Sequence, residues 1–265
     1  MVDNLNYLSR YWMTLSIICA EGAMTDSTSG RRIERVRHEL RLRELTVVRV
    51  ARPTPGFASI TFGGDALADF VSLSFDDHVK FFCPGCDAKR DYTPRHFDAA
   101  RRELTIDFAL HDDGPASNWA RSAAPGAVAT IAGPRGSMII PADHDWHLLV
   151  GDASSLPAIR RRVEELPAGA RVIVVAELAS ADRVALAGEA AIETFWADDA
   201  DALLDRVRAL RLPDGDGFAW CAGEAATMKR LRALLVDELG LAPDALKVAA
   251  YWKRGEAGHH EQPGG

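Results

Sequence analysis

The segment at residues 90–95, RDYTPR, carries side chains that could together bind a phosphorylated aromatic molecule. The guanidinium groups of Arg90 and Arg95 can each neutralise a phosphate through paired hydrogen bonds. Between them, the ring of Tyr92 can stack on a planar ring system, and the hydroxyl of Thr93 can hydrogen-bond its edge. Alone, the segment is also compatible with a strand that has solvated arginines and a half-buried tyrosine.

A second candidate site lies at residues 111–119, HDDGPASNW, where a predicted strand ends and a short helix begins. Pro115 suits the first position of a helix, so the free backbone amides of the three following residues would form a cradle for a phosphate. The two aspartates before Gly114 would repel an anion. Arg90 or Arg95 would therefore have to lie close by; otherwise the segment is only an Asp-capped helix.

The elements that must position these residues differ between the two halves of the chain. Between residues 45 and 133, short segments separated by turn residues are typical of an antiparallel barrel or sandwich. The predicted strands are 45–52, 58–63, 78–83, 91–95, 104–111 and 127–132. In 104–111, apolar residues alternate with Thr105, Asp107 and His111, which predicts one buried face and one polar, ligand-facing side.

From Trp146 onward, uniformly apolar runs alternate with amphipathic helical patterns. The predicted strands are 146–150, 172–176, 191–196, 218–222 and 246–252, and the predicted helices are 156–166, 200–210 and 224–239. This order predicts an open parallel α/β sheet, which binds ligands at the carboxyl ends of its strands. Residues 134–145 would be the hinge between the halves.

Four more motifs join the first two: GPRGS at 133–137, GDASSLPAI at 151–159, WCAGEAA at 220–226 and YWKRG at 251–255. In this order the motifs resemble those of the siderophore-interacting protein family of ferric-siderophore reductases, from about residue 49 to residue 255. The resemblance implies an antiparallel six-stranded FAD-binding barrel followed by an open parallel-sheet NAD(P)H-binding domain, within the ferredoxin-reductase-like group. We expect the barrel at 31–141 and the α/β domain at 142–256, between an N-terminal extension, 1–30, and a polar tail, 257–265.

Carried over by position, the resemblance assigns cofactor contacts in both halves. For FAD these are Arg90, Tyr92, Thr93, Arg95, Asp107, His111, Gly114, Ala116, Ser117 and Trp119. In the nicotinamide half they are Gly151, Asp152, Ser154, Ser155, Gly223, Glu224 and Trp252. Because the cofactor carries the chemistry in such an enzyme, we expect no side chain to act as a nucleophile or general acid.

The chain also departs from the family pattern. Many members have Glu-Thr where this chain has Ala153 and Ser154, so a carboxylate is missing from the loop that should meet the nicotinamide nucleotide. Ser59 stands where arginine is common. No strand is followed by G-x-G-x-x-G, which excludes the ordinary dehydrogenase fingerprint.

The sequence leaves the choice between NADH and NADPH open. Glu177 ends the second parallel strand, where an acid could bind a ribose 2′-hydroxyl and favour NADH. Arg183 follows in the next loop and could bind a 2′-phosphate instead. Either residue could also be an ordinary surface charge.

The chain has 265 residues, with 31 Lys and Arg against 38 Asp and Glu, a formal net charge of −7. That balance argues against general nucleic-acid binding, which needs a basic field. An anionic ferric chelate would therefore need a local basic patch. The predicted substrate-binding residues are Arg135, Lys253 and Arg254, of which the last two could also be solvated charges at the end of a strand.

Together these inferences predict an NAD(P)H-dependent ferric-siderophore reductase. A hydride would pass from NADPH or NADH to FAD, and single electrons would then reduce Fe(III) to Fe(II), which hard oxygen chelators hold less tightly. One alternative is a flavin oxidoreductase with a protein or another small molecule as acceptor. A second is a non-enzymatic ferric-siderophore carrier, which would not need the second half of the chain.

The longest apolar stretch near the start, residues 11–20, is about half of the ~20 residues that cross a bilayer, so we expect no membrane span. Residues 20–23 leave a signal peptide open, but a translation start at Met24 is the preferred interpretation. Few, scattered cysteines argue against a secreted disulfide scaffold and favour a cytoplasmic protein. We expect a monomer that acts on a ferric siderophore.

The turn-like sequence from Cys83 to Cys86, CPGC, is the remaining motif with chemical potential. A Cys-x-x-Cys pair can bind zinc or act as a redox couple. Pro-Gly at its centre indicates a turn between strands, and the spacings to His78 and His96 fit no usual zinc finger. We expect no metal site here and leave the redox role open.

Overall fold

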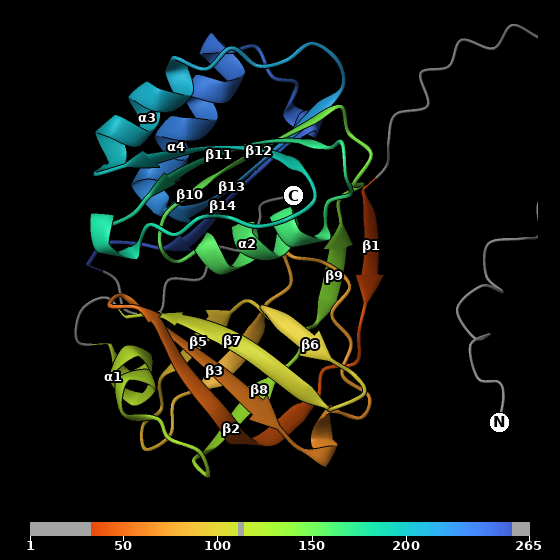
Figure 1. The fold of residues 1–265 in the computed structure, drawn as a ribbon, viewed down its shortest axis with the longest axis vertical. Helices are drawn as coiled ribbons and strands as arrows, with labels where there is room; N and C mark the ends of the chain where they lie inside the picture. The colour runs from red at the N-terminus through yellow and green to blue at the C-terminus, as the bar shows by residue number, and fades with distance from the viewer. Residues whose placement is uncertain (1–32, 111–113, 256–265) are drawn as a thin grey trace, which may run out of the picture. The chain divides into compact units, whose positions relative to one another are not determined.

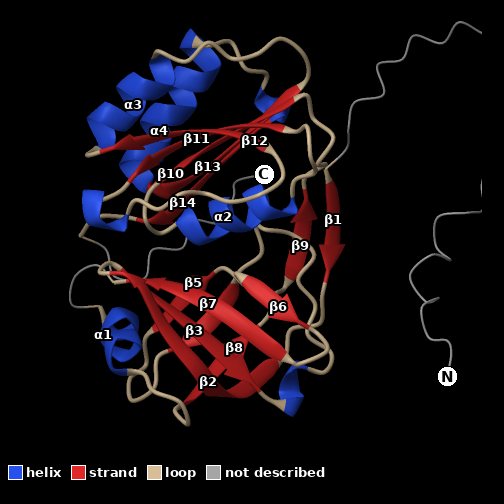
Figure 2. Cartoon of the chain, viewed as in Figure 1, coloured by secondary structure: helices blue, strands red, loops and turns tan. Residues whose placement is uncertain are grey.

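The computed structural model describes residues 33–110 and 114–255. The first part of this chain forms a seven-stranded antiparallel sheet with the order β5-β4-β8-β2-β3-β7-β6. Figure 2 shows strands of this sheet in red. Its strands are β2 (Leu42–Thr54), β3 (Phe57–Gly63), β4 (Val79–Phe82), β5 (Lys89–Tyr92), β6 (His96–Asp98), β7 (Glu103–Ala109) and β8 (Val128–Ala132). All six predicted strands are present, but the predicted strand count was wrong. β6 has three residues, too few for an alternating pattern to mark it.

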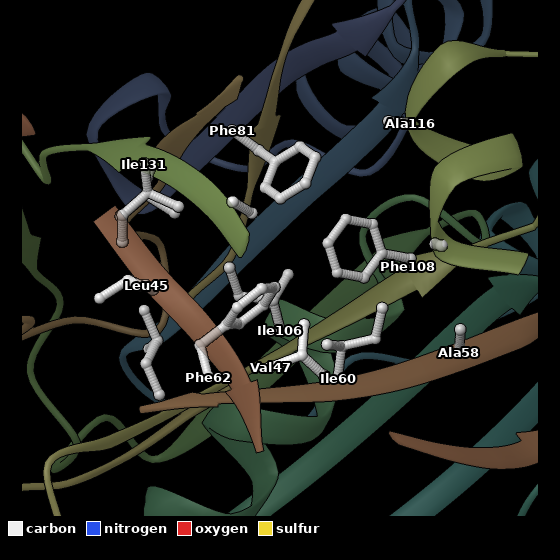
Figure 3. Close-up of a cluster of buried hydrophobic side chains, with 14 of the residues drawn as sticks. Leu45, Val47, Ala58, Ile60, Phe62, Phe81, Ile106, Phe108, Ala116 and Ile131 are labelled. Carbon is white, nitrogen blue, oxygen red and sulfur yellow. The ribbon is translucent and has the colours of Figure 1, made fainter. Parts of the chain in front are cut away.

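The core of this sheet is a cluster of aliphatic and aromatic side chains that point inward from its strands (Figure 3). Phe62, Phe81 and Phe108 are fully buried there, and burial of each such side chain stabilises the fold by roughly 1.5–3 kcal/mol. The helix α1 (Pro115–Ser122) contributes Ala116 and Ala120 to the same cluster. The core therefore fixes α1 against the strands that it follows.

A second sheet, of five parallel strands, has the order β12-β11-β10-β13-β14 (Figure 1). The strands are β10 (Trp146–Gly151), β11 (Arg171–Glu177), β12 (Ala191–Ala197), β13 (Gly217–Glu224) and β14 (Leu246–Trp252). The helices are α2 (Leu156–Glu165), α3 (Ala200–Arg208) and α4 (Ala225–Ala233), and α4 continues into a π-helical turn (Leu234–Glu238). The predicted parallel α/β sheet and its helices are thus confirmed.

The two faces of the parallel sheet are covered differently. Leu203 and Val207 of α3 and Leu231 of α4 pack on one face, and Ile159 and Val163 of α2 pack on the other. Short 3-10 turns complete the described chain at Asp65–Leu67, Ser180–Asp182 and Pro243–Ala245. None of the helices in the described ranges is long and apolar enough to cross a membrane.

Two short strands join the segments before and after the antiparallel sheet. β1 (Glu34–Arg37) pairs antiparallel with β9 (Gly136–Ile139), and a Cβ at Gly136 would lie 2.6 Å from the Val36 carbonyl oxygen. This strand pair was not predicted, and β9 lies within residues 134–145, which we expected to connect the two halves. β1 is charged and mostly exposed, so its sequence shows no apolar alternation from which a strand could be predicted.

The predicted boundary at 141/142 falls between β9 and β10. The predicted N-terminal extension and polar tail, and the predicted site residue His111, lie outside the described residues.

Candidate functional site

The predicted flavin-stacking residues Tyr92 and Trp119 belong to one aromatic cluster at the junction of β5 and α1. The ring centroid of Tyr92 lies 4.4 Å from that of Phe108 and 5.9 Å from that of Phe81. The centroid of Trp119 lies 4.9 Å from that of Phe81. Burial raises the pKa of Tyr92, so its hydroxyl stays protonated as a hydrogen-bond donor at neutral pH. The structure brings these two predicted residues together through two phenylalanines.

Arg90 and Thr93 flank Tyr92 but differ in exposure. Arg90 is half-buried on the same side of β5 as Tyr92, and its Nη1 donates to the Lys89 carbonyl oxygen at 2.8 Å. Within the described chain, no carboxylate pairs with its guanidinium. Thr93 is buried just beyond the strand. Arg90 is therefore the arginine of this motif whose charge remains available for a phosphate.

Arg95 has a different environment from Arg90. Its side chain is buried, with 8% exposure, and its guanidinium forms two hydrogen bonds with Glu164 of α2, one of them 2.7 Å long. Its Nε lies 3.7 Å from Oδ2 of Asp107, to which Arg160 also donates at 3.3 Å. Arg95 thus holds α2 against the antiparallel sheet.

Asp107, on the polar side of β7, is also covered by α2, contrary to the ligand-facing position predicted for it. Asp107 is 5% exposed, and its Oδ1 has no hydrogen-bond partner in the described chain. The prediction failed because the periodicity of one strand shows which side chains are polar and does not show which neighbouring element covers them.

The predicted phosphate cradle at the start of α1 is present in part. Gly114 precedes the helix without a side-chain cap, and Pro115 occupies the first turn as predicted. The amides of Ala116 and Ser117 lie in this turn, where backbone amides lack intrahelical acceptors. The third predicted amide, of Asn118, donates to the Gly114 carbonyl oxygen at 2.8 Å, so it is not available to a ligand.

Ser117 connects this turn to the preceding strand, because its Oγ donates to the Ala109 carbonyl oxygen at 3.2 Å. The start of α1 and the end of β7 are therefore held together. At this end of the sheet, the donors are Arg90, Thr93 and the amides of Ala116 and Ser117, for which the described residues offer no helical acceptor; they lie next to the rings of the aromatic cluster. That set fits an aromatic cofactor with a pyrophosphate.

The predicted residues of the second half meet at Asp152, which follows β10. Its Oδ1 accepts hydrogen bonds from the amide and the hydroxyl of Ser154, at 2.9 Å and 2.5 Å. Its Oδ2 accepts from the amide of Glu224 at 2.9 Å and from the indole Nε1 of Trp252 at 2.8 Å. One carboxylate thus joins the carboxyl ends of β10, β13 and β14.

Close packing explains the two glycines at this edge. A Cβ on Gly223 would lie 2.6 Å from Oδ2 of Asp152, and a Cβ on Gly151 would lie 1.9 Å from Oγ of Ser155. Ser155 is fully buried, and its hydroxyl donates to the Asp152 carbonyl oxygen at 2.9 Å. These residues shape the loop after β10.

Glu224 begins α4, where its side chain accepts a hydrogen bond from the Thr227 amide at 3.0 Å. Partial burial raises its pKa, but hydrogen bonds from the amides of Thr227 and Arg254 more than offset this, so the net pKa is lowered. Glu224 is therefore ionised at neutral pH. Its negative charge lies at the same edge as that of Asp152.

The predicted substrate-binding residues lie on different elements. Arg135 follows the cis peptide bond between Gly133 and Pro134, and its carbonyl oxygen accepts from the His38 amide at 2.9 Å. Arg254 follows β14, and its amide donates to Glu224 at 3.3 Å. Lys253 precedes it and is exposed. Arg135 therefore lies against the β1 segment, and the other two lie at the carboxyl edge of the parallel sheet.

The sequence reasoning missed the charged side of α2. Arg161 donates to the Pro94 carbonyl oxygen at 2.8 Å and to the Ser72 hydroxyl at 2.8 Å, so it contacts the antiparallel sheet domain. Arg162 donates to the Pro141 carbonyl oxygen at 2.6 Å. In the sequence these arginines lie outside the apolar stripe of the predicted helix, which indicates only that they are polar. The available sequence signal for such contacts was the run of three arginines, 160–162, followed closely by two glutamates, 164 and 165.

Asp76 is a second missed contact. Its Oδ1 accepts from the indole Nε1 of Trp220 at 2.8 Å, and its Oδ2 pairs with the ammonium group of Lys247. These partners stand on β13 and β14, so a loop of the antiparallel domain is tied to the parallel sheet. A lone aspartate carries no sequence signal for such a contact.

The cysteines of the described chain are free thiols. Burial raises the pKa of Cys83 to about 11, and the Cys86 amide donates to the Cys83 carbonyl oxygen at 3.3 Å, as in the turn that Pro-Gly predicts. No group of three or more potential ligand side chains in residues 33–110 and 114–255 is placed to hold a metal ion.

Two family models match this chain. Residues 144–255 match the siderophore-interacting protein model, and residues 46–89 and 87–138 match the siderophore-interacting FAD-binding domain. The fold and these matches define a two-part flavoprotein, in which a FAD-binding antiparallel domain precedes a parallel α/β domain. The chain belongs to the siderophore-interacting protein family, as its motifs indicated.

Three relatives resemble the chain over most of its length. The NADPH-dependent ferric-chelate reductase of Escherichia coli is 40% identical over 246 residues, which cover 83% of this chain and 96% of that protein. The ferric vibriobactin reductase ViuB of Vibrio cholerae is 28% identical over 252 residues, covering 83% and 93%. The crystal structure of a siderophore utilization protein from T. fusca superposes with a TM-score of 0.79 at 35% identity, covering 86% and 99%.

Proposed function

We propose that this chain is an NAD(P)H-dependent ferric-siderophore reductase that carries FAD. The observation that carries the proposal is the position of α2. This helix begins directly after the Asp152 loop, and its Leu156 packs in one apolar cluster with Ala109, the last residue of β7. The loop expected to hold a nicotinamide is therefore held against the strand that leads to the expected flavin phosphates.

Such proximity is what hydride transfer requires, because the reacting atoms must approach to about 3–3.5 Å. Farther along α2, Arg160 contacts Asp107 and Glu164 pairs with Arg95. Both ion pairs are partly buried, and the pair between Arg160 and Asp107 fixes the helix on β7. A non-enzymatic carrier would have no use for this attachment.

For FAD, the fitting residues lie around the aromatic cluster. Arg90 and the amides of Ala116 and Ser117 would bind phosphate oxygens, while Tyr92 and Trp119 would border the ring system. FAD, when bound, supplies the chemistry that couples a two-electron hydride donor to a one-electron acceptor. Arg95 would act indirectly, by positioning α2.

For the substrate, the names of two relatives support a ferric chelate. The Escherichia coli protein is named as a ferric-chelate reductase and the Vibrio cholerae protein as a ferric vibriobactin reductase. We propose that Lys253 and Arg254 attract the anionic chelate at the carboxyl edge and that Arg135 contributes from the β1 side. The variants Arg135→Ala and Lys253→Ala/Arg254→Ala separate these contributions. Each should raise KM for a ferric siderophore without changing flavin content, and an unchanged KM would remove that group from the substrate site.

The deciding experiment starts from purified protein with FAD. Its absorbance spectrum is recorded, and NADH and NADPH oxidation is then followed anaerobically with a ferric siderophore and a ferrous-iron trap. We expect a flavin spectrum and trapped Fe(II) in a ratio of about two per nicotinamide oxidised, because a hydride carries two electrons. Flavin reduction without Fe(II) would point to another acceptor. Protein that binds the chelate but no flavin would point to a carrier.

We also propose that the protein is a monomer and acts in the cytoplasm, where reduced nicotinamide nucleotides are the electron source. Light scattering coupled to size-exclusion chromatography measures the mass, and a dimer mass would contradict the first proposal. Cell fractionation with mass spectrometry of the N-terminus tests the second. A mature N-terminus between residues 20 and 23 in an exported fraction would contradict it.

A further inference from the structure

Charged residues at the carboxyl edge of the parallel sheet bear on whether the protein uses NADH or NADPH. This question deepens the proposed function and rests on it. The two dinucleotides differ only at the adenosine ribose, where NADPH has a 2′-phosphate and NADH has a hydroxyl. In open parallel sheets, an acid at the end of a strand can accept hydrogen bonds from that ribose.

The sequence analysis named Arg183 as a possible ligand of a 2′-phosphate. In the structure its guanidinium binds neighbouring residues instead. Its Nε donates to the Leu178 carbonyl oxygen at 3.0 Å, and its Nη2 donates to the Ala197 carbonyl oxygen at 3.2 Å. The same Nη2 pairs with the carboxylate of Asp198. Its charge is thus neutralised within the loops after β11 and β12.

Glu177 is placed differently. It is the last residue of β11 and is half-buried. Within the described residues, no hydrogen bond reaches its side chain. Its carboxylate therefore has acceptor capacity left for a ligand, and a ribose diol presents two hydroxyl donors.

The strand register puts acids on both sides of Glu177. On one side Gly151 pairs with Ala176, so Asp152 follows β10 next to Glu177. On the other side Glu177 pairs with Ala197, two residues before Asp199, while Asp198 between them is paired with Arg183. Burial, Asp152 and Asp199 all raise the pKa of Glu177, and Arg254 partly opposes them. The field at this position is therefore negative.

We propose that Glu177 reads the adenosine ribose and makes this chain prefer NADH to NADPH. Its carboxylate accepts hydrogen bonds from the ribose hydroxyls, whereas a 2′-phosphate, with about 1.5 to 2 negative charges at pH 7, is repelled by Glu177 and its acidic neighbours. Arg183 does not offset this repulsion because Asp198 holds it. The name of the Escherichia coli relative describes that protein as NADPH-dependent, and the residues argued from here are those of this chain.

The test uses holo-protein and two ligands without a nicotinamide ring, ADP-ribose and 2′-phospho-ADP-ribose, so that binding is measured without turnover. Isothermal titration calorimetry should give at least about tenfold tighter binding of ADP-ribose, a ratio that narrows with added salt as charges are screened. Glu177→Gln should weaken ADP-ribose binding and reduce the ratio. The ratio of kcat/KM for NADH and NADPH should change in the same direction.

Glu193→Gln is the matched control, because Glu193 is an exposed carboxylate on β12 of the same sheet, away from its carboxyl end. It should leave both dissociation constants unchanged. Equal or tighter binding of the 2′-phosphorylated ligand by the unmodified protein would overturn the inference. So would an unchanged ratio in Glu177→Gln, or no binding of ADP-ribose.

The outcomes also separate this inference from the proposed function. Trapped Fe(II) together with a preference for NADPH would leave the reductase intact and remove the role of Glu177. A preference for ADP-ribose without Fe(II) from any ferric siderophore would remove the reductase and leave a nucleotide site read by Glu177.

Discussion

The indole nitrogen of Trp252 lies 2.8 Å from Oδ2 of Asp152, so a residue at the end of β14 is bonded to the loop after β10. These strands are not neighbours, because β13 lies between them. The amide of Glu224, at the end of β13, donates to the same oxygen at 2.9 Å. A single carboxylate thus fixes three strand ends at the edge where the nicotinamide nucleotide is proposed to bind.

The first prediction concerns this carboxylate. Asparagine at position 152 keeps one oxygen, so its amide nitrogen would face either the two donors of Ser154 or those of Glu224 and Trp252. Asp152→Asn should lower the free energy of unfolding by about 1.5–3 kcal/mol, because bonds to a charged acceptor are lost. It should also raise KM for the nicotinamide nucleotide. Urea titration and steady-state kinetics measure the two effects.

Ser154→Ala is the control for that variant. It removes only the hydroxyl bond to Oδ1, so the expected loss of unfolding free energy is about 1 kcal/mol or less. Equal effects of the two variants would mean that the bonds to Glu224 and Trp252 contribute nothing.

The second prediction separates the two arginines of the RDYTPR segment. Arg95→Ala leaves Asp107 buried with Arg160 as its remaining cation, so it should lower the free energy of unfolding by about 3–5 kcal/mol. Glu164→Gln should cost at most about 1 kcal/mol, because Glu164 is exposed. Arg90→Ala should instead reduce FAD affinity and leave the stability of the apoprotein unchanged.

Chemical denaturation of the apoprotein and flavin titration measure these quantities separately. If Arg95→Ala keeps its stability but loses FAD, Arg95 binds a flavin phosphate as first predicted, and its structural role is contradicted.

The third prediction is a pH dependence of stability at Glu177. Burial and then Asp152 raise its pKa above the ordinary value of 4.5, so the folded state binds its proton more tightly than the unfolded state. Stability from this group is therefore present at low pH and falls as pH rises from 4.5 through the raised folded pKa. Glu177→Gln removes the effect, so it should gain stability relative to the unmodified protein between about pH 4 and about pH 7.

Glu238 gives the opposite sign and serves as the comparison. A hydrogen bond from Arg208 lowers its pKa, so its contribution is present above 4.5 and is lost as pH falls through the folded pKa. Glu238→Gln should therefore be slightly less stable at neutral pH, with the difference vanishing in acid. Urea midpoints measured across the pH range check both signs, and identical pH profiles for the two variants would contradict the argument.

The fourth prediction concerns thiol reactivity. Cys83 and Cys221 are buried with raised pKa values, whereas Cys86 is exposed on the turn. Because the thiolate is the reactive form, iodoacetamide at neutral pH should, among these three described cysteines, label Cys86 first and Cys83 and Cys221 only after unfolding. Peptide mapping by mass spectrometry identifies the labelled positions. Rapid labelling of Cys83 in the folded protein would reopen a redox role for the pair.

Much of the fold was predictable because local patterns carry it. The strands at 146–150 and 172–176 were predicted from runs that are apolar on both faces, as in parallel strands buried between two helical layers, and the other three from the repeat of the same strand and helix order. The predicted helices followed from amphipathic spacing. β1, β6 and β9 were missed because they are too short or too charged for any period to show.

The candidate site was predictable to a smaller extent. The motifs placed Asp152, Glu224 and Trp252 in the same half of the chain. Their spacing in the sequence does not predict that the carboxylate of Asp152 accepts hydrogen bonds from both Glu224 and Trp252. Arg90 and Arg95 look alike in the sequence. Their difference arises from α2, which brings Glu164 to one of them through a contact between positions far apart in the chain.

By itself, the sequence determined the two-part architecture, the family and the cofactor class, because these follow from periodicity and from ordered motifs. Only the tertiary structure decided which charges remain available to ligands. Arg95, Arg183 and Asp107 are paired with oppositely charged side chains, whereas in residues 33–110 and 114–255 no such partner is found for Arg90 or Glu177. The physical reason is that the availability of a charged group depends on what packs against it, and that is set by distant segments brought together on folding.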